Sequence, residues 1–158
     1  MNIFFLDRDI EKAAKSHIDK HIVKMPLETA QIICTAAHIH GIEEEIPYKP
    51  CHENHPCTKW AVESKDNLKW LIFFGFCLCR EYTYRYEKKH ACEGKVLEWA
   101  VEKEITSSFP SKGITERPLA MPDNFKCEDP VKAYRSYYKG DKKSIASWKK
   151  REEPYWWD

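Results

Sequence analysis

The sequence has few glycines and no long apolar run. Only 5 of its 158 residues are glycine, so it is poor in the residue that tight β-turns require. No apolar run approaches the roughly 20 residues that a membrane-spanning helix needs, and we expect no membrane partner. The start, MNIFFLDRD, lacks the basic region and the small-residue cleavage site of a secretory signal. A cytoplasmic protein is therefore expected.

The sequence also lacks the even number of cysteines that is typical of a disulfide framework. The chain has 7 cysteines and no export signal, so we expect reduced thiols. The loop CHENHPC does gather zinc-ligand residue types, namely Cys51, His52, His55 and Cys57. Possible second pairs are Cys77/Cys79 and His90/Cys92, which are spaced more tightly than standard zinc ligands. We expect no metal and no cofactor, with a structural zinc as the alternative, and nothing local supports a nucleophilic pair of Cys57 and His21.

The net charge of +1 gives little overall attraction to nucleic acid, but the charge is unevenly spread. Residues 130–151 contain eight Lys and Arg against one acid, whereas the last seven residues carry three acids and no base. Aromatic residues are interleaved with these bases, a pattern that is typical of nucleic-acid binding and also of a solvated helix face. Phosphates attract lysine, and unstacked bases need flat aromatic partners. We predict DNA contacts from Tyr137, Tyr138, Lys139, Lys142 and Lys143, whereas Trp156 and Trp157 could instead close the core.

The pattern along the chain predicts an all-α fold: a single domain over residues 1–158 with about four or five helices and long proline-containing loops. NIFFL is either a short strand or an anchored apolar segment. Asp9 and Asp129 are candidate N-caps, and Gly41 suits the end of a helix. Pro26 either opens a new helix or kinks a longer one. The expected helices cover residues 10–24, 26–40, 58–86 with a possible interruption at 64–67, 93–103, and a segment from 130.

One line of polar side chains follows the second of these helices. His17, His21, Lys24, Glu28 and Gln31 are spaced i, i+4, i+7, i+11 and i+14, which places them on one helical face. Apolar residues occupy the opposite face. The line is either the solvated side of an amphipathic helix or, if a cleft forms over it, a His–Glu pair for acid–base chemistry.

The stretch DKHIVKMPLE resembles a pattern of small phage pyrimidine-dimer DNA glycosylases: D-x-H near the N-terminus, with Glu seven residues after the His. Three further features follow in the same order: the loop pair Asn54-His55, a long aromatic-rich helix ending near CREYTYRY, and a basic, Tyr-rich C-terminal segment. The resemblance implies an all-α DNA glycosylase with AP-lyase activity. Such an enzyme would act in the host cytoplasm if phage-encoded.

Specific roles follow from this resemblance. An amine would attack the sugar, Glu28 would act as acid and base, and His21 would position the sugar or leaving group. The amine is that of Met1 or Lys24. A reference α-amine has a pKa of about 7.7–8.0 against about 10.4 for lysine, so the terminus is favoured unless the lysine is desolvated or crowded by charge. The predicted DNA contacts in this half of the chain are His17, Gln31, Asn54, His55 and Lys59.

The chain also departs from the family pattern. In the family the nucleophile is the α-amine of a small residue exposed by removal of Met, but here bulky Asn2 follows Met1. The family's arginines directly before the Glu and three residues after it are replaced by Leu27 and Gln31. We expect a monomer whose partner is duplex DNA with a damaged or modified pyrimidine. A base-modifying transferase and a non-enzymatic nucleic-acid-binding module remain alternatives.

Overall fold

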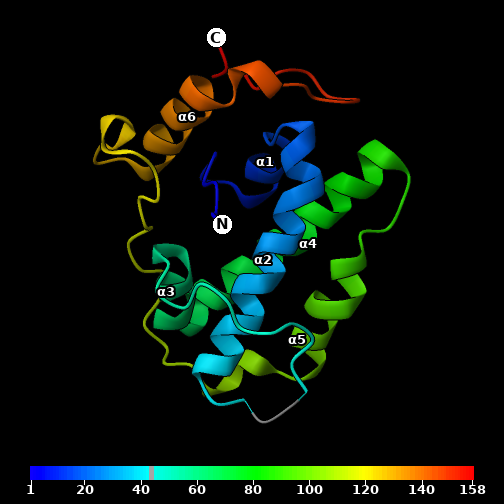
Figure 1. Ribbon diagram of the computed structural model, residues 1–158, viewed down its shortest axis with the longest axis vertical. Coiled ribbons are helices and arrows are strands. Elements are labelled where there is room, and N and C mark those ends of the chain that lie inside the picture. The colour runs from blue at the N-terminus through cyan, green and yellow to red at the C-terminus, as the bar shows by residue number, and fades with distance from the viewer. Residues whose placement is uncertain (43–44) are drawn as a thin grey trace.

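The computed structural model describes residues 1–42 and 45–158. This part of the chain contains helices and turns but no β-strand (Figure 1). A π-helical turn, Glu93–Glu98, leads into the fifth α-helix, and short 3-10 turns occur later. The all-α prediction is confirmed, with six α-helices in the described part rather than four or five. These are α1 (Ile10–Lys15), α2 (Asp19–Ile39), α3 (Pro56–Glu63), α4 (Lys65–Tyr86), α5 (Trp99–Glu102) and α6 (Pro130–Asp141).

The two long helices, α2 and α4, pack against each other in the middle of the molecule. Helix α6 and the chain after it lie at one end, while α5 lies toward the other (Figure 1). The buried apolar face of α3 and α4 includes Trp60, Leu68, Leu71, Phe74 and Leu78. None of the helices in residues 1–42 and 45–158 is long and apolar enough to cross a bilayer.

The N-terminal segment forms an extended anchor, not a strand. Ile3, Phe5 and Leu6 have no exposed surface, and Phe4 is only 5% exposed. Burial of four apolar side chains fixes the chain start inside the fold, because each buried side chain of this size contributes about 1.5–3 kcal/mol. The first residues are thus held in place and do not fray.

The break between α1 and α2 differs from the expectation. A continuous helix was predicted over residues 10–24, but the chain breaks at residues 16–18. Of the two alternatives for Pro26, a new helix start or a place within a longer helix, the structure shows the second, because Pro26 lies inside α2. The Ser16 carbonyl accepts a hydrogen bond from Trp148 Nε1 at 3.0 Å. The Ile18 N–H donates to the Tyr138 hydroxyl at 3.1 Å. Distant side chains therefore satisfy the backbone groups that the break frees.

Other predicted boundaries are confirmed. Helix α2 ends just before Gly41, whose φ of +67° is the left-handed conformation that favours glycine. The interruption expected within residues 64–67 occurs at Ser64, which ends α3 and caps α4 by accepting a bond from the Asp66 N–H. Asp129 caps α6, and its carboxylate accepts from the Val131 N–H at 2.9 Å.

Candidate active site at the N-terminus

Asn2 locks the chain start against the C-terminal part of the molecule. Its side-chain amide donates to the Ala120 carbonyl at 2.8 Å, and its oxygen accepts from the Ile3 N–H at 2.8 Å. The Tyr134 hydroxyl on α6 lies 3.4 Å from that oxygen and also donates to the Pro118 carbonyl at 2.8 Å. The position of the first two residues is therefore fixed by a segment more than a hundred residues away.

Glu28 is the acidic centre of the site. It lies on α2, and only 7% of the residue is exposed. Its Oε2 accepts a hydrogen bond from the Asn2 N–H at 2.9 Å and lies 3.7 Å from the α-amine of Met1. Its Oε1 lies 3.2 Å from Lys24 Nζ. The carboxylate is thus held between two amines.

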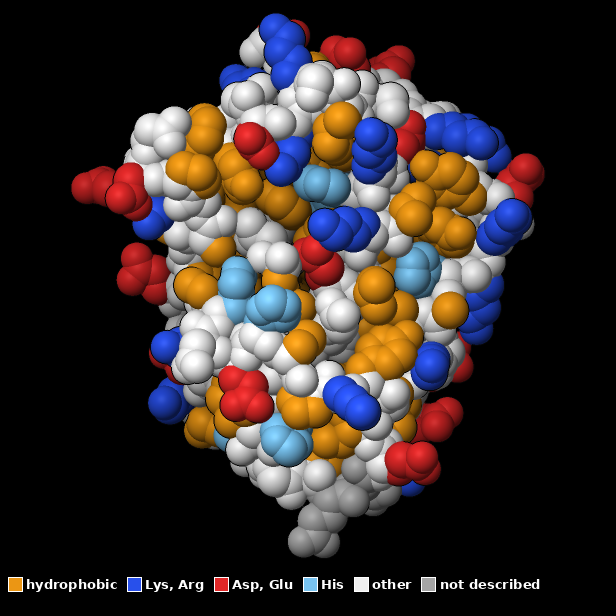
Figure 2. Space-filling model, in the orientation of Figure 1, with side chains coloured by type: hydrophobic (Ala, Val, Ile, Leu, Met, Phe, Trp, Pro, Cys, Tyr) orange, Lys and Arg blue, Asp and Glu red, His pale blue; other side chains and the backbone are white. Residues whose placement is uncertain are grey.

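His55 borders the same amine. It caps α3 by accepting the Cys57 N–H on Nδ1 at 3.1 Å, and its pKa is lowered by burial, by the charge of the N-terminus and by His52. The backbone of Met1 and the charge of Glu28 act in the opposite direction on this pKa and raise it. Figure 2 shows histidine side chains near the middle of this face, beside acidic and basic side chains. The predicted position of His55 beside the candidate centre is consistent with this arrangement.

His21 is held between an aromatic ring and a hydroxyl. Its ring stacks on Phe4, with 4.8 Å between centroids, and its Nδ1 lies 2.8 Å from the Tyr138 hydroxyl. Burial, followed by the charges of Lys142 and Lys24, lowers the pKa of His21 to about 4. The imidazole is therefore neutral near pH 7, and a role as a hydrogen-bond donor fits it better than a role as a proton carrier.

Two predicted DNA contacts are wrong for this conformation. His17 and Tyr138 have no exposed surface. His17 donates from Nδ1 to the Ala13 carbonyl at 2.7 Å, and burial lowers its pKa to about 3. Tyr138 bonds to Ile18 and His21 inside the core. The helical spacing did not reveal this burial, because His17 lies in the break before α2, where its ring packs against Phe4, Phe74 and Tyr138.

The remaining predicted residues lie at or near the surface. Asn54, Lys59 and Lys143 are exposed, whereas Gln31, Tyr137, Lys139 and Lys142 are partly buried. Lys142 pairs with Asp141 and lies over the Tyr137 ring, 5.2 Å from its centroid. Trp156 and Trp157 are partly buried and pack against the core, as the alternative for them predicted.

Sequence reasoning missed three residues that shape the site. Asn2 was considered only as an obstacle to removal of Met1, and its anchoring bonds were not foreseen. Tyr134 and Cys57 were not assigned to the site, yet the Cys57 thiol lies 3.5 Å from Asn2 Oδ1. Burial raises the pKa of Cys57 to about 12, so this thiol is an inert packing group. Only the position of Asn2 next to the terminus could have signalled this cluster.

The chain was also compared with known protein families. A family model described as pyrimidine dimer DNA glycosylase matches residues 1–94. The match covers more than half of the chain, and the protein belongs to this family of DNA-repair glycosylases. Neither the curated proteins nor the solved structures contain a significant match. Residues 95–158, which contribute Ala120, Tyr134 and Tyr138, lie outside the matched region.

Proposed function

We propose that the protein is a DNA glycosylase with AP-lyase activity whose nucleophile is its N-terminal amine. Membership of the family supports a pyrimidine-dimer-glycosylase-like function on DNA. The observation that carries the mechanism is the position of Glu28, whose Oε2 lies 3.7 Å from the Met1 α-amine and accepts the Asn2 N–H at 2.9 Å. A nucleophile beside a carboxylate that can move protons is the pair this chemistry needs.

The first chemical step exchanges the base for the amine. The neutral α-amine forms a bond to C1′ of the target nucleotide as the C1′–N bond breaks. The base leaves with that electron pair and takes up a proton. Glu28 stabilises the positive charge that develops on the sugar, and loss of the amine proton with ring opening gives an imine. His21 positions the sugar.

The second step cuts the strand. Glu28 removes a proton from C2′ of the imine, and the C3′–O bond then breaks with departure of the 3′ phosphate. Glu28 is well placed for both roles because its two oxygens face different amines and it has little contact with water. A conservative change at Glu28 should therefore affect the second step more than formation of the imine.

The surroundings favour the α-amine over Lys24. The Lys24 side chain is 66% exposed, so it lacks the desolvation that activates lysine nucleophiles. The Met1 side chain is 4% exposed and packs on the core, which keeps the α-amine in one place. The Asn2 nitrogen is nearer still to Glu28, and removal of Met1 would turn that nitrogen into the α-amine. Intact mass of the purified protein distinguishes the two forms.

The DNA-binding surface is proposed to extend from this site to the C-terminal basic segment. Exposed Lys143 and partly buried Tyr137, Lys139 and Lys142 supply charge and stacking surface. Asn54 and Lys59 add polar surface on the other side of the site. Leu27 and Gln31 stand where the family has arginines, so phosphate contacts must come from other residues.

The deciding experiment is reductive trapping. Purified protein is incubated with irradiated, abasic or undamaged duplex DNA in the presence of borohydride, which converts an imine to a stable amine link. We expect a covalent product on abasic DNA and on the irradiated duplex, with peptide mapping to the N-terminal residue. Acetylation of the terminus should abolish the product, whereas Lys24→Ala should not. Trapping that survives acetylation but not Lys24→Ala would transfer the role to the lysine, and no product on any DNA would contradict the proposal.

A further inference from the structure

The hydrogen bonds around Tyr138 determine which nitrogen of His21 carries the proton. The Tyr138 hydroxyl accepts the Ile18 N–H at 3.1 Å, so its own hydrogen is free to be donated. A buried hydroxyl hydrogen needs an acceptor, and the ring nitrogen beside it is His21 Nδ1, at 2.8 Å. A neutral imidazole that accepts on Nδ1 must carry its hydrogen on Nε2. Tyr138 thus fixes His21 as a donor through Nε2.

That donor is free and reaches the surface. Among the described residues, His21 Nε2 has no hydrogen-bond partner, yet it is not one of the unpartnered polar atoms that are sealed from solvent. His17 has the opposite tautomer: its Nδ1 donates to Ala13, and its Nε2 is sealed and unpartnered. The two histidines are one turn apart in sequence, but only His21 offers an N–H to a ligand.

The charges that act on the His21 ring are positive. Lys24 is on the next turn of α2, and Lys142 follows Tyr138 by one turn of α6, with its backbone N–H bonded to the Tyr138 carbonyl at 2.9 Å. Each lysine has a carboxylate neighbour, Glu28 and Asp141 respectively. The charges of Lys142 and Lys24 both lower the pKa of His21, as positive charge near an imidazole does. An N–H donor with lysines on the neighbouring turns of two packed elements is suited to an anion.

We infer that His21 Nε2–H, Lys142 and Lys24 form a subsite for one phosphate of the DNA backbone next to the reacting sugar. The inference rests on the proposed function for the identity of the ligand, since the subsite lies on the same helix as Glu28. The subsite supplies phosphate contacts at a different place from Leu27 and Gln31, which stand where the family has arginines. Tyr138 is then a positioning residue, because it acts on the phosphate only through the tautomer of His21.

The first test uses inorganic phosphate and the ring nitrogens of His21. Long-range proton–nitrogen NMR spectra at neutral pH should show the Nε2–H tautomer alone, and the Nε2 signal should shift saturably as phosphate replaces chloride at constant ionic strength. Lys142→Gln should weaken phosphate binding by roughly three- to tenfold, the scale of a charge-assisted contact near the surface. Lys132→Gln, which removes the same charge from the other end of α6, is the matched control and should leave binding unchanged.

Three NMR outcomes would overturn the inference: an Nδ1–H tautomer, a His21 signal that phosphate does not move, or equal weakening by both substitutions. These readouts do not require catalysis. A phosphate response without reductive trapping would therefore leave the subsite standing and remove the lyase proposal. Trapping without a phosphate response would do the reverse.

The second test assigns the phosphate to DNA. Duplexes containing a stable abasic analogue are prepared with one backbone phosphate at a time replaced by a neutral methylphosphonate. One position next to the analogue should weaken binding of the parent protein by several-fold and leave the Lys142→Gln variant unaffected, because that variant has already lost the contact. Equal sensitivity of both proteins at every position would contradict the assignment to a DNA phosphate.

Discussion

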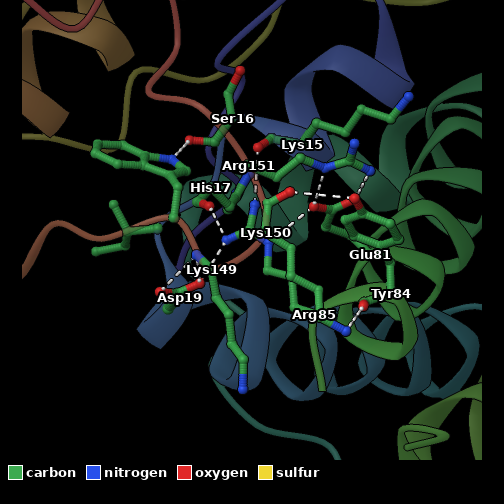
Figure 3. A network of polar contacts seen from close by, with 12 residues as sticks. Lys15, Ser16, His17, Asp19, Glu81, Tyr84, Arg85, Lys149, Lys150 and Arg151 are labelled. Carbon is green, nitrogen blue, oxygen red and sulfur yellow. Dashed lines mark hydrogen bonds and ion pairs between the residues drawn. The ribbon is translucent and has the colours of Figure 1, made fainter. Parts of the chain in front are cut away.

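Two polar clusters built on α2 differ in whether their hydrogen-bonding capacity is already used. The first surrounds Asp19 and contains Arg85, which is fully buried (Figure 3). Arg85 donates to Glu81 at 2.9 Å, to Asp19 at 3.0 Å, and to the carbonyls of His17 and Lys15. Asp19 also accepts the Lys149 N–H. Every group in this cluster has a protein partner, so it serves to hold elements together.

Arg151 extends this first cluster to the C-terminal segment. Its Nε and Nη2 donate to the two oxygens of Glu81 at 2.9 and 3.0 Å. Burial by itself would raise the pKa of Glu81, but hydrogen bonds from Arg151 and Arg85 outweigh it and lower the pKa. The aspartate of the D-x-H pattern therefore belongs to a structural network that ties three separate parts of the chain.

The second cluster, around Glu28, leaves groups available. The Met1 amine lies 3.7 Å from Glu28, which is longer than a hydrogen bond. Lys24 is mostly exposed, and His21 Nε2 has no partner in the described chain. A saturated cluster can only stabilise, whereas one with free donors and a poised amine can bind and react. Buried charge alone therefore does not mark a binding site in this fold. Donors and acceptors that have no protein partner are the better guide.

Glu28→Gln should give the largest effect. The amide keeps the hydrogen bond from Asn2 but cannot accept a proton, so we expect fold and DNA affinity to persist while lyase turnover falls by roughly two to four orders of magnitude. Single-turnover cleavage of abasic DNA measures the loss, and imine trapping should survive. Glu98→Gln, at an exposed ion pair with Lys89, is the control. Full lyase activity in the Glu28 variant would remove this carboxylate from the mechanism.

Arg85→Met should affect stability and not chemistry. Removing Arg85 takes one buried partner from Glu81, which keeps Arg151, and one from Asp19, which keeps the Lys149 N–H. Loss of one member of a buried ionic network costs about 3–5 kcal/mol of unfolding free energy. Urea denaturation measures the loss. Arg80→Met, on the same helix but 66% exposed, should cost less than about 1 kcal/mol. Activity per folded molecule should be retained, and a selective loss of turnover without destabilisation would erase the distinction between the two clusters.

The sequence predicted those parts of the fold that local pattern controls. The cap at Asp129, the end of α2 before Gly41 and the interruption at Ser64 all depend on residues within a few positions. The break at residues 16–18 depends instead on Trp148 and distant hydrogen bonds, so the local pattern did not locate it. Pro26, predicted either to open a helix or to kink a longer one, lies inside the longer helix α2.

The same reasoning separates the successes and failures at the site. Helical spacing brought Lys24 and Glu28 together, because they are four residues apart. It could not show that α6 covers His17, nor that Asn2 binds the segment at Ala120, because those contacts join residues over a hundred positions apart. Register along one helix predicts neighbours on that helix and says nothing of what packs over it.

Stability should decrease as the pH falls below about 6.5. The folded-state pKa values of His17 and His21 are about 3 and about 4, whereas the unfolded histidines titrate near 6.5. Between these values the unfolded chain binds more protons, so each histidine removes up to about 1.4 kcal/mol of unfolding free energy per pH unit. Urea denaturation from pH 7.5 to 5 measures this slope. His17→Asn should reduce the slope, and an unchanged slope would contradict the assignment of His17 as a buried neutral ring.

The C-terminal basic segment should control the salt dependence of DNA binding. Replacing Lys139, Lys142 and Lys143 with Ala should flatten the plot of log affinity against log salt by about three units or somewhat less. The change is expected to be smaller than three units because Lys142 already pairs with Asp141. The matched control changes three lysines outside this segment: Lys69, Lys95 and Lys112. A slope equal to that of the parent protein would exclude the segment from the interface.

Metal chelators should have the smallest effect of all. Residues 1–42 and 45–158 contain no group of three or more His, Cys, Asp or Glu side chains placed to hold a metal ion. In the CHENHPC loop, the Cys57 thiol is buried against Asn2 and His55 is occupied as a helix cap. Neither is free to bind zinc without disrupting the N-terminal site. Strong chelation should therefore leave both the melting temperature and DNA binding unchanged. Stoichiometric zinc in purified protein, with unfolding on its removal, would show that this loop is a metal centre and that Asn2 and Glu28 depend on it.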